Sequence, residues 1–244
     1  MSSSASDPQG LAFASLAEDY ERGRYGWPPE IAAVDATTVL DLAAGTGKLT
    51  AVLAARYPEV IAVEPLATMR RVLEQKLPAA RALEGTAEAI PLEDDSVDAV
   101  FVGDAFHWFD PDAAPREVAR VLRPQGSLVV CFNHWRSGFR PRLPDDASEY
   151  WRDVTSGLPP AGGGKVESGE WRRALQAFEP LEERAIDHEW HTDAEGVAAY
   201  YASVSSMGFA APEQREQWRD RLLELIPPGR YELALTARVY TGVR

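Results

Sequence analysis

Residues 39–50 read Val-Leu-Asp-Leu-Ala-Ala-Gly-Thr-Gly-Lys-Leu-Thr, an apolar run followed by a turn with two glycines. The apolar run predicts a buried strand, and the Ala- and Leu-rich segment from 49 to 56 predicts a helix. Gly45 and Gly47 let the backbone adopt positive φ and approach a ligand without Cβ atoms in the way. The stretch therefore predicts a strand, a ligand-binding turn and a helix, which is the first unit of an α/β domain.

The same alternation continues to residue 132. Further strands are expected at 60–63, 80–84, 97–103 and 127–132, and helices at 67–75 and 115–122. The strands read as near-continuous hydrophobic runs, which is typical of a parallel sheet covered on both faces. Strands that alternate with helices predict a doubly wound α/β domain, in which ligands bind beyond the carboxyl ends of the strands.

Residues 133–180 break this pattern because they are rich in glycine and proline. They predict an insertion after the strand at 127–132 that consists of loops with one or two helices. A Pro-Gln-Gly turn at 123–126 is expected to precede that strand. After the insertion we expect strands at 183–190 and 231–240 and helices at 193–205 and 212–225.

Composition and charge restrict the class of protein. The chain has 244 residues, 45% of them hydrophobic, and a formal net charge of −13. These values predict one soluble globular domain and disfavour nucleic acid as a partner. No apolar run approaches the roughly 18 residues that a membrane span needs, and the start lacks a signal-peptide pattern. The single cysteine, Cys131, excludes a cysteine-based metal site within the chain, and we expect a cytoplasmic protein without a metal.

One basic cluster interrupts the acidic chain. Arg136, Arg140 and Arg142 lie close together among glycine and proline residues. This cluster predicts a solvated loop, and the alternative is contact with an anionic substrate, because the guanidinium group suits carboxylates.

Two acidic residues indicate which ligand the glycine turn binds. Glu64 ends the second expected strand, where a carboxylate can accept hydrogen bonds from both hydroxyls of a ribose. Asp41 precedes the turn, where a carboxylate would repel a pyrophosphate but suits a ligand with an ammonium or sulfonium charge. Position 50 is Thr, so the third glycine of a dinucleotide fingerprint is missing. The pattern favours S-adenosylmethionine over NAD, and a tight turn without a ligand is the structural alternative.

Asp41-x-x-x-Gly45-x-Gly47 resembles the first motif of the class I S-adenosylmethionine-dependent methyltransferases. Further similar segments follow in the family's order, at 63–65, 85–92, 96–102, 105–109 and 117–126. Residues 13–28 and 231–240 resemble the small-molecule branch that includes trans-aconitate methyltransferase-like proteins. The resemblance implies a doubly wound, mostly parallel seven-stranded sheet, the Rossmann-like methyltransferase fold, with an insertion after strand five.

The resemblance also implies how one methyltransferase domain over residues 1–244 is divided. A flexible tail at 1–10 would precede a lid helix at 11–30. The cofactor-binding core would occupy 39–132, and the insertion at 133–180 would form the substrate side. Residues 181–244 would complete the sheet.

By position, the resemblance assigns S-adenosylmethionine a set of contacts. Gly45 and Gly47 would touch the methionine part, Glu64 the ribose and Met69 the adenine. Tyr20 and Arg24, which share a helix face, would close over the cofactor carboxylate. The other cofactor-binding residues implied are Asp41, Ala43, Pro65, Thr86, Ala87, Glu88, Asp104, Ala105 and Phe106.

His107 is the candidate catalytic residue. It follows the fourth expected strand, near the place implied for the transferred methyl group. It could act as a general base or orient the acceptor, and the alternative is a structural histidine beside Trp108. A carboxylate acceptor needs no base, and alignment alone can supply on the order of 7–11 kcal/mol.

The leading hypothesis is methyl transfer to a small molecule, at oxygen of a carboxylate or hydroxyl, or at nitrogen. The alternatives are a regulatory protein that binds S-adenosylmethionine without catalysis, or an NAD-dependent oxidoreductase. We expect a small-molecule acceptor as partner, no nucleic acid, no membrane, and a monomer or homodimer. Four aromatic residues either wall the substrate pocket or pack in the core: Trp151, Trp171, Tyr200 and Tyr201.

Overall fold

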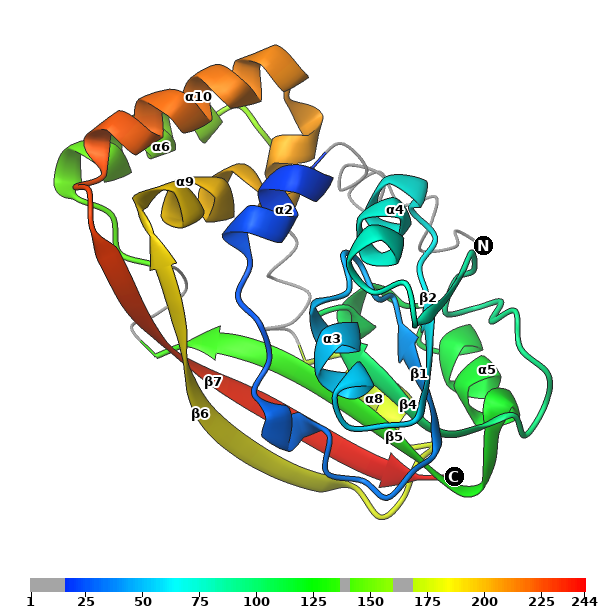
Figure 1. Ribbon diagram of the computed structural model, residues 1–244. Coiled ribbons are helices and arrows are strands. Elements are labelled where there is room, and N and C mark those ends of the chain that lie inside the picture. The colour runs from blue at the N-terminus through cyan, green and yellow to red at the C-terminus, as the bar shows by residue number, and fades with distance from the viewer. Residues whose placement is uncertain (1–15, 137–140, 160–168) are drawn as a thin grey trace.

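The computed structural model describes residues 16–136, 141–159 and 169–244. Its centre is one seven-stranded sheet in the order β3-β2-β1-β4-β5-β7-β6, shown in Figure 1. Neighbours from β3 to β5 are parallel, and β7 runs antiparallel to both β5 and β6. The doubly wound, mostly parallel, seven-stranded fold expected from the sequence is therefore confirmed.

The bounds of the elements agree closely with those expected. The strands are β1 (Thr38–Leu42), β2 (Glu59–Val63), β3 (Arg81–Leu83), β4 (Val97–Gly103), β5 (Leu122–Trp135), β6 (Glu182–Asp193) and β7 (Arg230–Val243). The α-helices are α2 (Ala17–Gly23), α3 (Lys48–Ala54), α4 (Ala67–Lys76), α5 (Ala113–Val121), α6 (Asp145–Thr155), α8 (Arg172–Leu175), α9 (Ala194–Ala202) and α10 (Pro212–Leu225). Short 3-10 helices are η3 (Pro29–Ile31), η4 (Phe106–Trp108) and η5 (Ser205–Phe209).

The central strands bring the motif residues to one edge of the sheet. Every residue of β1 is buried, which explains its unbroken apolar sequence. Val39 pairs with Val60 of β2 on one side and with Ala99 of β4 on the other. Because all three strands are parallel, their carboxyl ends open at the same edge. The glycine turn, Glu64 and Asp104 follow these three ends.

The prediction that a turn at 123–126 precedes the fifth strand is wrong, because β5 already begins at Leu122 and runs through these residues. The pairing of β4 with β5 shifts between Val97, which faces Leu122, and Ala99, which faces Ser127. The extra residues form a bulge in which Gln125 has a φ of 68°. A bulge keeps the strand continuous while it accommodates the proline and glycine. The helix α5 also begins before Pro115, at Ala113.

Three large hydrophobic cores surround the described sheet, and one of them packs α3 and η3 against the central strands. The first core lies between the sheet and the helices α5 and α8. The second contains Tyr25, Trp135, Trp190 and Tyr200 and is covered by α6, α9 and α10, which gather at one end of β6 and β7 in Figure 1. Trp151, Tyr200 and Tyr201 are buried in this second core, whereas Trp171 belongs to the first.

The helix α2 joins the second core to the edge of the sheet that carries the glycine turn. It packs closely on α9, because a Cβ on Gly23 would lie 2.2 Å from the Ala199 backbone. The ion pair of Arg22 with Asp193 at the start of α9 adds to this contact, and the ion pair of Asp19 with Arg219 joins α2 to α10.

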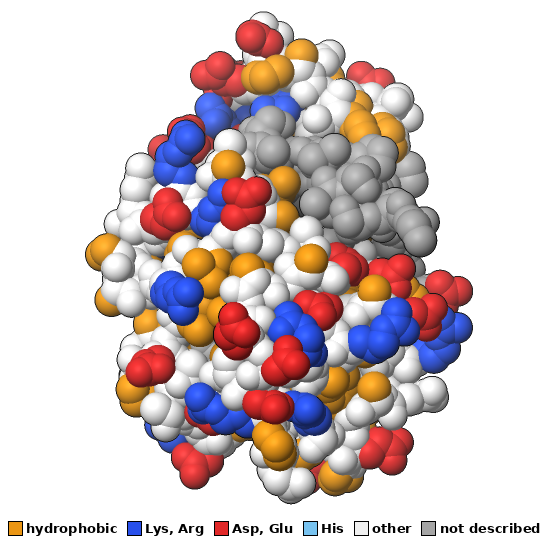
Figure 2. All heavy atoms as spheres, turned by 90° about the vertical axis from the view of Figure 1, so that its right-hand side faces the viewer, with side chains coloured by type: hydrophobic (Ala, Val, Ile, Leu, Met, Phe, Trp, Pro, Cys, Tyr) orange, Lys and Arg blue, Asp and Glu red, His pale blue; other side chains and the backbone are white. Residues whose placement is uncertain are grey.

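Parts of the sequence-based expectations lie outside the described residues. These are the tail at 1–10, the start of the lid at 11–15, Arg140 and the glycine run at 162–164. In the ranges that are described, no helix is long and apolar enough to cross a membrane. Acidic and basic side chains are interspersed over the face in Figure 2.

We expect Gly47→Ala to lower the free energy of unfolding by about 2–3 kcal/mol. Gly47 has a φ of 84°, and an added Cβ would lie 2.9 Å from Leu73 Cγ. Urea denaturation measures the change. The control is Gly26→Ala, where the added Cβ meets nothing within 4 Å. Equal losses in the two variants would contradict this account of the turn.

Candidate functional site

The glycine turn has an unusual backbone. Ala43, Gly45 and Gly47 have φ values of 60°, 57° and 84°, all in the left-handed region. Only the two glycines adopt this region without strain, so the alanine is held there by its surroundings. The Ala44 N–H donates to the Val63 carbonyl (3.1 Å), which ties the turn to the end of β2.

Glu64 braces the turn from β2. Its Oε2 accepts a hydrogen bond from the Gly45 N–H (2.8 Å), and its Oε1 accepts from the Leu66 N–H (2.9 Å). Burial raises the pKa of this carboxyl, although the two N–H donors oppose the shift. An ionised carboxylate has about four acceptor positions, so about two remain for other donors such as ribose hydroxyls.

Asp41 lies beneath the turn and is buried. Its Oδ2 accepts a hydrogen bond from the Thr50 hydroxyl (2.6 Å), which fastens β1 to the first turns of α3. Burial raises the pKa of Asp41 to about 7, and nearby Glu64 adds to the shift. The residue that replaces the third glycine of a dinucleotide fingerprint is thus the partner of the motif carboxylate.

Asp104 follows β4 in the left-handed region, with a φ of 52°. Its Oδ1 accepts from the Asn133 N–H (2.9 Å), and its Oδ2 accepts from the Tyr25 hydroxyl (3.1 Å). Burial raises the pKa of Asp104 to about 6. Backbone strain of this kind persists where neighbouring contacts hold it, and it is common in functional sites. Sequence reasoning selected Asp104 and placed Tyr25 in the segment 13–28 that resembles a lid, but it did not predict that Tyr25 and Asn133 bind Asp104.

Tyr20 and Arg24 lie above the turn. A Cβ on Gly45 would lie 4.0 Å from the Tyr20 ring. The Arg24 guanidinium is 5.0 Å from the ring centroids of both Tyr20 and Tyr200, and it donates to the Ser203 hydroxyl (3.1 Å) and carbonyl (2.9 Å). Burial raises the pKa of Tyr20 to about 12, so its phenol is neutral at physiological pH. The structure therefore brings both predicted residues to the turn.

An ion-pair cluster that we did not predict fastens α2 to the turn. The Glu21 carboxylate is 3.5 Å from Lys48 Nζ and 2.5 Å from Lys76 Nζ. Lys48 also donates to the Glu21 carbonyl (2.7 Å), and Lys76 donates to the Thr46 carbonyl (3.2 Å). We call these three side chains the α2 latch. It joins residues far apart in the sequence, so no spacing pattern reveals it.

The residues expected around the adenine lie beside the ends of β2 and β3. Met69 and Ala87 are buried, and Pro65 is half-buried directly after Glu64. Thr86 pairs with Ala89 in an isolated bridge. Glu88 Oε1 accepts a hydrogen bond from the Asp110 N–H (3.0 Å), which fixes the loop after η4.

The residues after Asp104 pack against the first core and against one another. Phe106 is buried among core side chains, with its ring 6.4 Å from that of Trp171, and Ala105 packs against the same cluster. The His107 ring is 5.0 Å from Trp108 and 5.8 Å from Phe132. His107 thus lies in an aromatic environment beyond the carboxyl end of β4.

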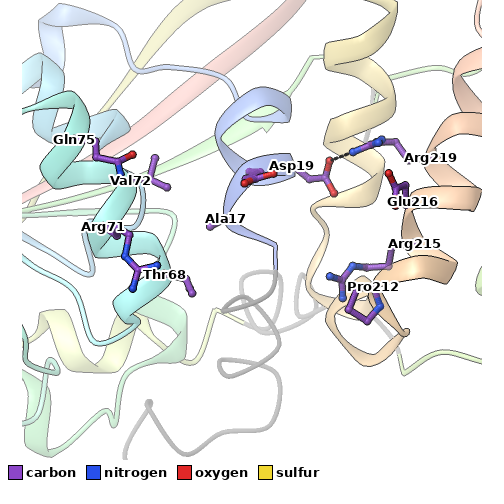
Figure 3. Close-up of a pocket in the computed structure, with 11 residues that line it drawn as sticks. Ala17, Asp19, Thr68, Arg71, Val72, Gln75, Pro212, Arg215, Glu216 and Arg219 are labelled. Atoms are coloured by element: carbon purple, nitrogen blue, oxygen red, sulfur yellow. Dashed lines mark hydrogen bonds and ion pairs between the residues drawn. The ribbon is translucent and has the colours of Figure 1, made fainter.

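A separate hollow of about 490 Å³ lies between α2, α4 and α10 (Figure 3). Arg71, Arg215 and Arg219 line it together with Glu18, Asp19 and Glu216. Arg219 pairs with Asp19 (3.0 Å). None of the predicted cofactor residues lines it. Its acidic and basic groups balance, so it selects no ligand charge.

The charges around the turn define what could bind there. Three carboxylates, Asp41, Glu64 and Asp104, lie around the ends of β1, β2 and β4. The Arg24 guanidinium lies above them, and the Arg70 guanidinium donates to the Glu64 carbonyl (2.7 Å). This arrangement suits a ligand with a carboxylate and more than one positive charge, and it opposes a pyrophosphate.

Comparison with known proteins gives concordant results. A family model described as a methyltransferase domain matches residues 40–130. An uncharacterized methyltransferase of Schizosaccharomyces pombe is 41% identical over 229 residues, which cover 89% of this chain and 88% of that protein. An uncharacterized methyltransferase of Mycobacterium tuberculosis is 54% identical over 129 residues, or 50% of this chain. This chain spans about half the length of that relative, 52%.

A solved structure confirms the fold. It belongs to a protein of Anaeromyxobacter dehalogenans described as a type II methyltransferase, with a TM-score of 0.63 and 21% identity. The similarity covers 90% of this chain and 97% of that one.

We expect the stability of the protein to depend on the charge of Asp41. Its pKa of about 7 in the folded state lies above the roughly 3.9 of an unfolded chain. The folded state therefore holds the proton more tightly, and its free energy of unfolding falls as pH rises from about 4 to about 7 and stays low above that. Asp41→Asn removes this charge. Relative to wild type, it should gain about 4 kcal/mol between pH 4 and pH 8.

Urea denaturation of both proteins at the two pH values measures that gain. A difference between variant and wild type that does not change with pH would contradict the buried position of the charge.

We also expect Glu21→Gln to loosen α2, because it removes the charge that both lysines share. Hydrogen-exchange mass spectrometry should show about tenfold faster exchange of the α2 amides, which corresponds to about 1.4 kcal/mol. Glu18→Gln is the matched control, since Glu18 is an exposed residue of the same helix. Similar exchange in both variants would show that the latch does not hold the helix.

Proposed function

This chain belongs to the methyltransferase family, and from that premise we propose that it binds S-adenosylmethionine above the glycine turn and transfers the methyl group to a small molecule. The observation that carries the proposal is the set of carboxylates around the turn, with Glu64 joining β2 to Gly45. Glu64 and Asp104 would each meet a group of the cofactor, whereas Asp41 would support the turn from beneath through Thr50.

The charges of the cofactor fit those of the cleft. S-adenosylmethionine has a carboxylate, an ammonium and a sulfonium, so its net charge is positive. Arg24 would hold the carboxylate, Asp104 the ammonium, and the free acceptor positions of Glu64 the ribose hydroxyls. The Thr46 hydroxyl is buried inside the turn and has no hydrogen-bond partner among the described residues. A buried hydroxyl of this kind suits a polar group of a ligand.

The chain's own residues would contribute to methyl transfer by holding the cofactor and the acceptor in position. Tyr20 and the α2 latch would cover the bound cofactor on the side of α2 and exclude water from it. Asp104 is held rigidly by Tyr25 and Asn133, so it needs no reorganisation to receive a cation. When bound, the cofactor supplies a methyl group activated by the adjacent sulfonium. His107 would orient the acceptor or take its proton, and the first role alone suffices for a carboxylate acceptor.

The finer proposal is methylation of oxygen, in a carboxylate or hydroxyl, or of nitrogen, as in the small-molecule branch that residues 13–28 and 231–240 resemble. The formal net charge of −13 supports a small acceptor over a nucleic acid, because an acidic chain repels the phosphate backbone. A regulatory protein that binds the cofactor without catalysis would use the same residues. Only an assay of methyl transfer to an acceptor distinguishes that alternative from the enzyme.

We expect wild-type protein to bind S-adenosylmethionine and S-adenosylhomocysteine in calorimetric titrations, and Glu64→Gln to raise both dissociation constants at least tenfold, since a lost charged hydrogen bond costs about 1.5–3 kcal/mol. Glu74→Gln, an exposed position on α4, is the control and should bind as wild type.

NAD serves as the competing ligand in the same titration. Folded wild-type protein that binds NAD, or that binds neither methionine-derived ligand, would refute the proposed function.

A further inference from the structure

A groove of about 530 Å³ lies beside His107, on the side of η4 that faces α8. Its walls are mostly aromatic: His107, Trp108, Phe109 and Trp171, with Pro111 at one end. None of the implied cofactor-binding residues lines it. We propose that this groove binds the acceptor and that the acceptor is a planar aromatic or conjugated molecule. The inference rests on the proposed function and names the substrate class of that site.

The aromatic wall is rigid before any ligand arrives. The Trp171 ring is 4.6 Å from Phe132, 5.1 Å from Tyr240 and 6.4 Å from Phe106, in tilted or edge-to-face geometry. The Arg172 guanidinium covers Trp171 at 4.6 Å and donates to the Tyr240 hydroxyl (2.9 Å). Trp171 is only 6% exposed, so it forms a rigid base for the groove, and the half-buried Trp108 and Phe109 are the rings on which a planar ligand would stack.

The charges at the rim favour a ring system without a net charge. Glu170 and Arg173 line the groove with opposite signs, and Arg173 is also 3.6 Å from Asp112. No excess of either sign remains to attract a charged ring. This differs from the surroundings of the glycine turn, where Asp41, Glu64 and Asp104 gather. The two spaces therefore select different ligands.

The size and position of the groove suit an acceptor. Small-molecule sites commonly enclose about 300–1,000 Å³, and the groove falls in that range with room for a fused bicyclic ring. His107 lines the groove and lies three residues after Asp104, the residue assigned to the cofactor ammonium. In the proposal, a substituent of a ring in the groove extends past His107 toward the cofactor. This places the reactive oxygen or nitrogen on a substituent of the ring.

The test compares a planar ligand with its saturated counterpart. Calorimetric titrations of 2-naphthol and decahydro-2-naphthol are made with protein saturated with S-adenosylhomocysteine. We expect 2-naphthol to bind at least tenfold more tightly. Trp108→Leu should reduce this preference to less than threefold, because it removes one stacking face. Trp218→Leu, a half-buried tryptophan of the second core, is the matched control and should keep it.

Phe109→Leu is the second variant, in case Trp108→Leu does not fold, and it should weaken 2-naphthol binding in the same direction. Failure of 2-naphthol to bind, equal binding of both alcohols, or a preference unchanged in the folded groove variants would overturn the assignment. S-adenosylhomocysteine is titrated first into each protein. If it binds and 2-naphthol does not, the acceptor class is wrong and the cofactor site stands; if it does not bind, the proposed function fails.

Discussion

The hydrogen bonds of the Glu64 carboxylate are the constraint on which the rest of the site depends. One oxygen holds the Gly45 N–H and the other holds the Leu66 N–H, so a single side chain fixes both the turn after β1 and the start of α4. Because the turn is fixed, Gly47 can begin α3 with a left-handed backbone, and α2 has a defined surface to cover. Burial makes these bonds strong, and it also raises the pKa of the carboxyl that forms them.

Burial also raises the pKa of Asp41 and of Asp104. Keeping either carboxyl ionised therefore lowers the stability of the fold. Each carboxyl lies where its charge is poorly solvated, and each is held by hydrogen bonds to neighbouring elements rather than by a salt bridge. A protein evolved for stability alone would place apolar or neutral groups there. Three such carboxyls at one sheet edge are better explained by a ligand with positive charge, which would restore favourable interactions to the ionised forms.

The parallel core could be predicted from the sequence because local patterns determine it. Apolar runs in the sequence predict β1, β2 and β4. The spacing of the motif residues predicts the glycine turn and the place of Glu64. Contacts between distant segments could not be predicted in this way. Tyr25 meets Asp104 and Glu21 meets Lys76 only after the sheet and α2 have assembled. Thr50 is intermediate, because its sequence position was informative but its bond to Asp41 required the helix geometry. The bulge in β5 shows that a proline and glycine turn can be absorbed within a strand.

A crystal structure of the protein with S-adenosylhomocysteine tests the central claim most directly. The account predicts the ribose hydroxyls within hydrogen-bond distance of Glu64, the ligand carboxylate at Arg24, and its ammonium at Asp104. It also predicts that the Gly45 N–H stays within reach of the Glu64 carboxylate, because that bond shapes the turn. A ligand bound elsewhere, such as in the hollow between α2, α4 and α10, or a ribose that makes no contact with Glu64, would contradict the account.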